Sequence, residues 1–134
     1  MPGCASLNRA TSVTVVRHLL LKEPVSSGPR TYIQRHATLV RALFADFCTA
    51  IAHGVTLHPV TMCPANFGTS YTGTFYAGDR VLATFIYGPT GCQYLTLTAT
   101  GRTRGTLLIG AAAAAAPHLR ADLAAVLGLP ASQV

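Results

Sequence analysis

Two cysteines at the ends of a strand-like stretch constrain the fold of this chain more than any other feature. Cys63 lies in the turn-like segment 62–68, and Cys92 ends the turn-forming segment 88–92. Two runs typical of strands lie between them, so a hairpin would bring the two sulfur atoms together. A Cys63–Cys92 bond would staple a β-meander and stabilise the fold by about 3–4 kcal/mol on a chain-entropy estimate.

Other states of the four cysteines stay open at the level of sequence. Four cysteines allow three complete pairings, and Cys63 and Cys92 could also be buried free thiols. Cys48 lies on the apolar side of an expected helix, where a small hydrophobic residue is ordinary. Cys4 follows Pro2 and Gly3 as in a bacterial lipoprotein cleavage box, so it is a candidate for lipidation, and it could instead pair with Cys48.

Composition predicts one domain with few charges. The chain has 134 residues, of which half are hydrophobic, with ten basic and four acidic residues and a net charge of +6. This size supports a single core, and we expect a disordered N-terminus over 1–10, an α+β domain over 11–128 and a tail over 129–134. The low charge density and the expected disulfide favour an extracytoplasmic protein, secreted or lipid-anchored at the cell surface.

Periodicity predicts the order of the elements. Leu39, Leu43, Phe47 and Ile51 recur every four residues and predict a helix over 37–52, and a second stripe predicts a C-terminal helix over 117–127. β-branched or alternating runs predict strands near 11–18, 31–34, 69–76, 81–87, 92–98 and 106–109, with a glycine-bounded loop over 101–105. The expected fold class is α+β, an antiparallel sheet of about four to five strands with both helices on one face.

The segment from residue 63 to residue 92 resembles a known pattern. Cys63-Pro64, Phe67-Gly68, Tyr71, Phe75 and Gly91-Cys92 are similar to the core motif of small secreted or lipoprotein-like proteins of actinobacteria, and the resemblance extends over residues 12–128. That family has no assigned activity. The resemblance therefore implies a location and a disulfide, and it does not imply a chemistry.

No arrangement of residues predicts catalysis or a metal site. Cys48, His53, His58 and Cys63 recur every five residues, a spacing that turns successive helix positions to different sides, so we expect no metal and no cofactor. The sequence has no nucleophile elbow, and its acids are too dispersed to predict a carboxylate pair, so we expect no enzymatic activity.

The expected partners follow from the positive charge. Arg102 and Arg104 flank Thr103 at an expected hairpin tip, and with Arg30 and Arg35 they form a candidate binding patch. Such a patch favours an acidic cell-envelope polymer or a protein partner, and we expect no nucleic acid because no RNA-binding motif is present.

The biochemical activity stays unknown from the sequence, and a ligand-binding, partner-binding or structural role is the first expectation. An alternative is a protease inhibitor, because the segment 62–64 looks like the disulfide-anchored loop of a subtilisin inhibitor, with residues near Ala65 offered to the protease. We expect no membrane-spanning segment, since the apolar run 107–116 is about half the length that a helix needs, and no signal peptide is visible in the chain.

Overall fold

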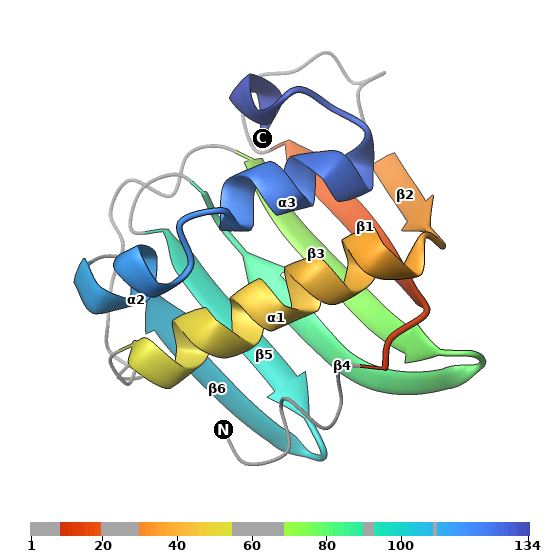
Figure 1. Ribbon diagram of the computed structural model, residues 1–134, viewed down its shortest axis with the longest axis horizontal. Coiled ribbons are helices and arrows are strands. Elements are labelled where there is room, and N and C mark those ends of the chain that lie inside the picture. The colour runs from red at the N-terminus through yellow and green to blue at the C-terminus, as the bar shows by residue number, and fades with distance from the viewer. Residues whose placement is uncertain (1–8, 20–29, 55–68, 90–92, 109) are drawn as a thin grey trace.

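Six antiparallel strands form one sheet with helices on one of its faces. The computed structural model describes residues 9–19, 30–54, 69–89, 93–108 and 110–134. The strand order is β2-β1-β3-β4-β5-β6, so β2 and β6 are the two edges (Figure 1). The strands are β1 (Ser12–Leu19), β2 (Arg30–Gln34), β3 (Thr69–Ala77), β4 (Arg80–Tyr87), β5 (Tyr94–Ala99) and β6 (Arg102–Leu107).

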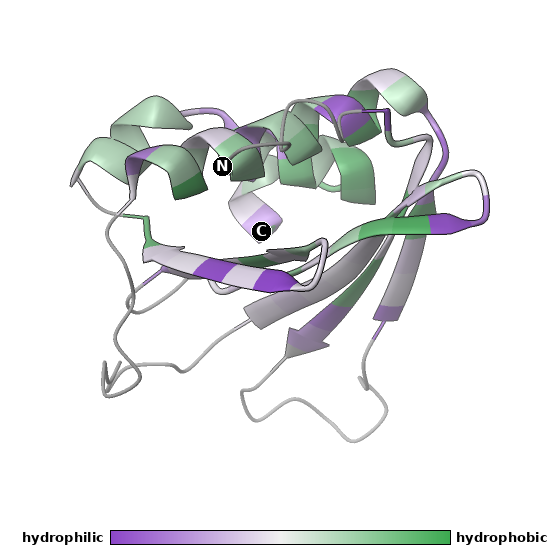
Figure 2. Cartoon of the chain, turned by 90° about the horizontal axis from the view of Figure 1, so that it is seen from below, coloured by the Kyte–Doolittle hydropathy of each residue, from purple (hydrophilic) through white to green (hydrophobic). Residues whose placement is uncertain are grey.

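The helical layer covers a single face of this sheet. It consists of α1 (Ala37–His53), α2 (Gly110–Ala115) and α3 (Leu119–Leu127), followed by a short 3₁₀ turn, η2 (Ala131–Gln133). Figure 2 shows all the helices on one side of the sheet, with the opposite face uncovered by them. In the described part of the chain, no helix is long and apolar enough to cross a membrane.

The core lies between α1 and the central strands. The apolar stripe of α1 is buried as its periodicity predicts, and its Phe47 ring lies 4.6 Å from the Phe85 ring and 5.9 Å from the Phe75 ring, centroid to centroid. Gly73 of β3 makes this packing possible. A β-carbon there would lie 2.4 Å from the Phe85 ring and 2.7 Å from the backbone oxygen of Thr14.

The predicted α+β class and the placement of both helices on one face are confirmed, with one strand more than expected. β6 begins at Arg102, inside the segment that the sequence analysis assigned to a loop. The turn from β5 needs only Thr100 and Gly101, both with positive φ angles of 51° and 75°. Such a two-residue hairpin lets pairing begin at once, so Ala99 is paired with Arg102.

Both ends of the described chain pack on the domain. Ala10 is fully buried, although the sequence analysis assigned residues 1–10 to disorder. Leu129 and Val134 pack against the core, and Arg17 donates a hydrogen bond of 2.6 Å to the backbone oxygen of Gln133. The expected tail is therefore held in place by a side chain of β1. The C-terminal helix also starts later than predicted, at Leu119, with α2 as a separate short helix before it.

Candidate functional site

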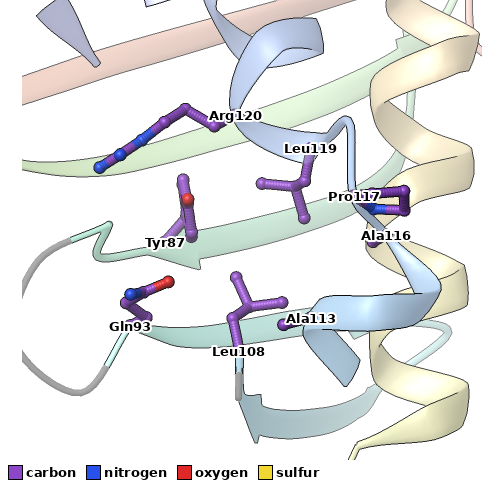
Figure 3. Close-up of a pocket in the computed structure, with 8 residues that line it drawn as sticks. All are labelled: Tyr87, Gln93, Leu108, Ala113, Ala116, Pro117, Leu119 and Arg120. Atoms are coloured by element: carbon purple, nitrogen blue, oxygen red, sulfur yellow. The ribbon is translucent and has the colours of Figure 1, made fainter. Parts of the chain in front are cut away.

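A small cleft lies where the ends of β4 and β5 meet the α2–α3 connection. It encloses about 180 Å³. Figure 3 shows the side chains that surround it, which come from the sheet on one side and from the helical layer on the other: Tyr87, Gln93, Leu108, Ala113, Ala116, Pro117, Leu119 and Arg120. Five of these are aliphatic residues or proline, so the walls are mostly apolar, and the volume corresponds to about six water molecules.

Three polar side chains converge on this cleft, and one of them is charged. Arg120 is exposed, and its Nη2 donates a long hydrogen bond of 3.4 Å to the backbone oxygen of Pro89. Tyr87 is buried, and this burial raises the pKa of its hydroxyl, while the nearby Arg120 guanidinium partly offsets the rise. Gln93 stands at the mouth in a left-handed conformation, with φ of 51°. The site therefore combines apolar walls with one cation.

A second arginine–tyrosine pair lies behind the cleft. The Tyr71 ring stacks on Tyr87 with centroids 6.3 Å apart and planes inclined by 24°. Burial raises the pKa of Tyr71, and the neighbouring Arg17 guanidinium moderates the rise. Within the described part of the chain, the buried Tyr71 Oη and Arg17 Nε have no well-formed hydrogen bond. Two cations and two phenols thus lie close together here, those of Arg17, Arg120, Tyr71 and Tyr87.

The carboxyl groups of Asp46 and Asp122 meet away from the cleft, between α1 and α3. Burial between the helices, together with the hydrogen bond and negative charge of Asp122, raises the pKa of Asp46 to about 8. The dispersed acids of the sequence do not predict a carboxylate pair. The packing of α1 against α3 creates one, and the pair holds a proton at neutral pH.

We expect Asp46→Asn to stabilise the protein at neutral pH. The unfolded chain releases the Asp46 proton near pH 3.8, whereas the folded chain keeps it to about pH 8. The wild-type free energy of unfolding should therefore fall as the pH rises between these values, because the unfolded state binds fewer protons. Since Asp46 is only partly buried, we expect a gain for Asp46→Asn of about 1–2 kcal/mol at pH 8 and little at pH 4.

Urea unfolding across this pH range measures the effect. Asp79→Asn, in the exposed hairpin between β3 and β4, is the matched control and should follow the wild-type pH dependence. Parallel pH profiles for wild type and Asp46→Asn would contradict the shared proton.

The structure does not gather the arginines of the predicted patch. Arg30 lies on β2 and Arg35 just after it, while Arg102 and Arg104 lie on β6. These are opposite edges of a six-stranded sheet, because the strand order separates β2 from β6 by four strands. Arg102 and Arg104 are also strand residues, paired with Ala99 and Leu97, rather than a hairpin tip.

Of the four cysteines, only Cys48 lies in the described residues. Cys48 is half-buried on α1 and is disulfide-bonded. Cys4, Cys63 and Cys92 lie outside the described residues, as do Ala65 and the candidate inhibitor loop, so the predicted Cys63–Cys92 pairing, the lipidation of Cys4 and the inhibitor alternative stay predictions.

In the portion of the chain that the structure describes, no three His, Cys, Asp or Glu side chains come together as a metal site would require. His53 is accounted for locally, since its Nδ1 lies 3.0 Å from the backbone oxygen of Thr49 in the last turn of α1. His58 and Cys63 lie outside the described residues.

Comparisons with known proteins add no family to this description. No family model, no curated protein and no solved structure matches the chain. The resemblance to small actinobacterial secreted proteins therefore stays a prediction.

No pattern in the sequence indicates the cleft. Tyr87 ends the predicted strand 81–87, and Arg120 follows Leu119 in the predicted C-terminal helix. Their proximity depends on how α3 crosses the sheet, which no local pattern encodes.

Proposed function

We propose that this protein is a non-enzymatic, extracytoplasmic binding domain whose cleft takes a small ligand with an apolar body and a negatively charged end. One observation supports this above all others: the walls of the cleft are mostly apolar, and among the described residues that line it Arg120 alone is charged. Among the described residues, no carboxylate is paired with Arg120, which donates its hydrogen bond to the backbone oxygen of Pro89. A guanidinium beside apolar surface is suited to a carboxylate.

The residues that line the cleft favour binding over catalysis. They include no Ser, Cys, His, Asp or Glu among the described side chains, so the groups that usually act as nucleophile or general base are not at hand. The phenols of Tyr87 and Tyr71 would stay protonated at neutral pH, since burial raises the pKa of each. The Tyr87 phenol, which lines the cleft, would act as a hydrogen-bond donor toward an anion.

The disulfide at Cys48 supports an extracytoplasmic location. Stable disulfides are rare in reducing compartments, and a low density of charged residues is common on exported domains. Either secretion or a lipid anchor at Cys4 would agree with this proposal. Acid quenching and alkylation of the source cells tests it, because a reduced Cys48 in the cell would contradict export.

Ligand binding is tested with matched pairs of small molecules. Benzoate and hexanoate fit a cleft of about 180 Å³, and benzyl alcohol and hexanol are their uncharged counterparts. We expect titration followed by NMR to show shifts at Tyr87, Gln93 and Arg120 with the acids. Arg120→Gln should weaken the binding of the acids by about tenfold, as loss of a charge-assisted hydrogen bond predicts, and leave the alcohols unaffected.

Arg104→Gln, on the exposed edge strand β6, is the matched control and should not change affinity. The proposal fails if none of the four compounds shifts the cleft residues at millimolar concentration, or if Arg104→Gln and Arg120→Gln weaken binding equally.

A further inference from the structure

The face of the sheet that is turned away from the helices carries a continuous row of threonines. The register pairs Thr14 with Thr74, Thr74 with Thr84, Thr84 with Thr98, and Thr98 with Thr103. Paired residues point to the same face, and on β1, β3, β4 and β5 these threonines have buried strand neighbours on the helical side, such as Val13 and Phe75. On the edge strand β6 the neighbours of Thr103 are exposed. We call these five residues the threonine row.

Most hydroxyls of the threonine row are free to form a hydrogen bond with a bound molecule. Thr98 and Thr103 share a hydrogen bond of 2.8 Å between their Oγ1 atoms, which leaves each with further bonding capacity. Thr14, Thr74 and Thr84 have no side-chain hydrogen bond within the described residues. At the usual strand spacing of about 4.8 Å, the row offers one hydroxyl and one methyl group per strand over about 20 Å.

The rest of this face is uncharged and partly apolar. The strand residues on it include no Lys, Arg, Asp or Glu among those that the structure describes. The three large hydrophobic residues with the greatest exposure all lie there: Ile33 at 58%, Val81 at 56% and Ile86 at 42%. In a protein of net charge +6, such a neutral face favours an uncharged partner.

A groove continues the threonine row at one end. It encloses about 340 Å³ and includes Thr14, the first member of the row. Its other main lining residues are Ser12, Ile33, Arg35, Tyr76 and Asp79. A phenol ring beside a guanidinium, a carboxylate and hydroxyls is suited to a sugar ring, whose C–H face packs on an aromatic side chain while its hydroxyls bond to polar groups.

We propose that this open face binds a single chain of a neutral β-linked polysaccharide. Each sugar unit of such an extended chain is about as long as the spacing between strands, so successive units can meet successive threonines of the row. The groove at Tyr76 would hold one end of the bound segment.

Two other occupants, a flat crystalline surface and a second copy of this chain, are disfavoured. Adjacent strands rotate by about 20–25°, so five strands turn the row too far to match a flat crystalline surface, whether of polysaccharide or of ice. A second copy of this chain would bury the hydroxyls against another row, at a cost for each one left without a partner. A single flexible chain can follow the twist and keep water at its outer side.

Isothermal titration of the whole protein with cellohexaose, chitohexaose and the α-linked maltohexaose tests the proposal. We expect binding of a β-linked hexasaccharide and not of maltohexaose. Tyr76→Ala should weaken this binding by about tenfold or more, and Thr84→Val by about fivefold, as loss of a stacking platform and of one hydroxyl predict. Thr84 is exposed and valine suits a strand, so that variant should stay folded.

Thr38→Val is the matched control, an exposed threonine of α1 on the opposite side of the protein, and it should leave binding unchanged. Arg120→Gln should also leave the binding of the hexasaccharide unchanged, because the cleft at Arg120 is a separate site on the helical side of the sheet. The proposal is overturned if no β-linked hexasaccharide binds at millimolar concentration, or if Thr38→Val weakens binding as much as Thr84→Val. It is also overturned if only crystalline material is bound, or if the protein dimerises through this face, shown by a dimer that Thr84→Arg dissociates.

Discussion

Replacing Phe47 by alanine is expected to lower the free energy of unfolding by about 3–5 kcal/mol, the range for large aromatic residues removed from a core. Phe47 is fully buried and lies under the middle of α1. Its ring contacts three others, those of Phe75, Phe85 and Tyr87, at centroid distances of 5.9, 4.6 and 6.4 Å. Deleting it leaves a cavity between α1 and the two central strands, which the ladder of backbone hydrogen bonds keeps from collapsing.

Thermal and urea unfolding measure this loss. For a domain of this size we expect the midpoint of thermal unfolding to fall by roughly 10–20 °C. Ile33→Ala is the matched control, because it removes a large apolar side chain that is 58% exposed, and it should change stability by about 0.5 kcal/mol or less. Equal losses for the two variants would contradict the placement of the core on the helical face alone.

Cys48→Ser should produce the second large loss, of about 2–5 kcal/mol, because Cys48 is disulfide-bonded and the bond ties α1 to another part of the chain. Removing the cross-link enlarges the unfolded ensemble, so the folded state becomes less favourable by comparison. Urea unfolding without a reducing agent measures the difference. The same stability for Cys48→Ser and wild type would contradict a structural role for this bond.

Single and double variants identify the partner of Cys48. Two bonded cysteines should give equal losses when each is replaced by serine, and the double variant should lose no more than either single one. If Cys63 and Cys92 pair as the sequence predicts, Cys4 is the cysteine left for Cys48. If Cys63→Ser or Cys92→Ser matches Cys48→Ser in this cycle, that predicted pairing is wrong, and the staple joins α1 to the meander instead.

Stability and binding depend on different faces of the protein. Phe47 and Cys48 act on the helical face and Asp46 on the interface between two helices, whereas the threonine row and the groove at Tyr76 lie on the other side of the sheet. Variants of the open face should therefore change affinity without a large change in unfolding free energy. The cleft at Arg120 belongs partly to the core, because its walls include buried residues such as Leu119.

Periodicity along the chain was enough to predict where most elements lie. The four-residue repeat from Leu39 to Ile51 predicted α1 to within a residue at its end, and the alternating run over 69–76 predicted β3 to within a residue. Local turn chemistry was less informative. Gly101 and Gly105 bracket a segment that looks like a loop, yet cross-strand pairing with β5 makes most of it a strand.

The amino-acid sequence by itself determined the α+β class, the helical stripe and the strands of the central sheet, because burial of one face imposes a repeat of about 3.6 or of 2 residues. Only the tertiary structure decided which side chains meet across elements. Asp46 lies beside Asp122, and Arg120 beside Tyr87, because α3 packs where it does on α1 and the sheet. Five threonines align across the open face because each strand takes one register. Such contacts join residues far apart in the chain, and no local repeat records them.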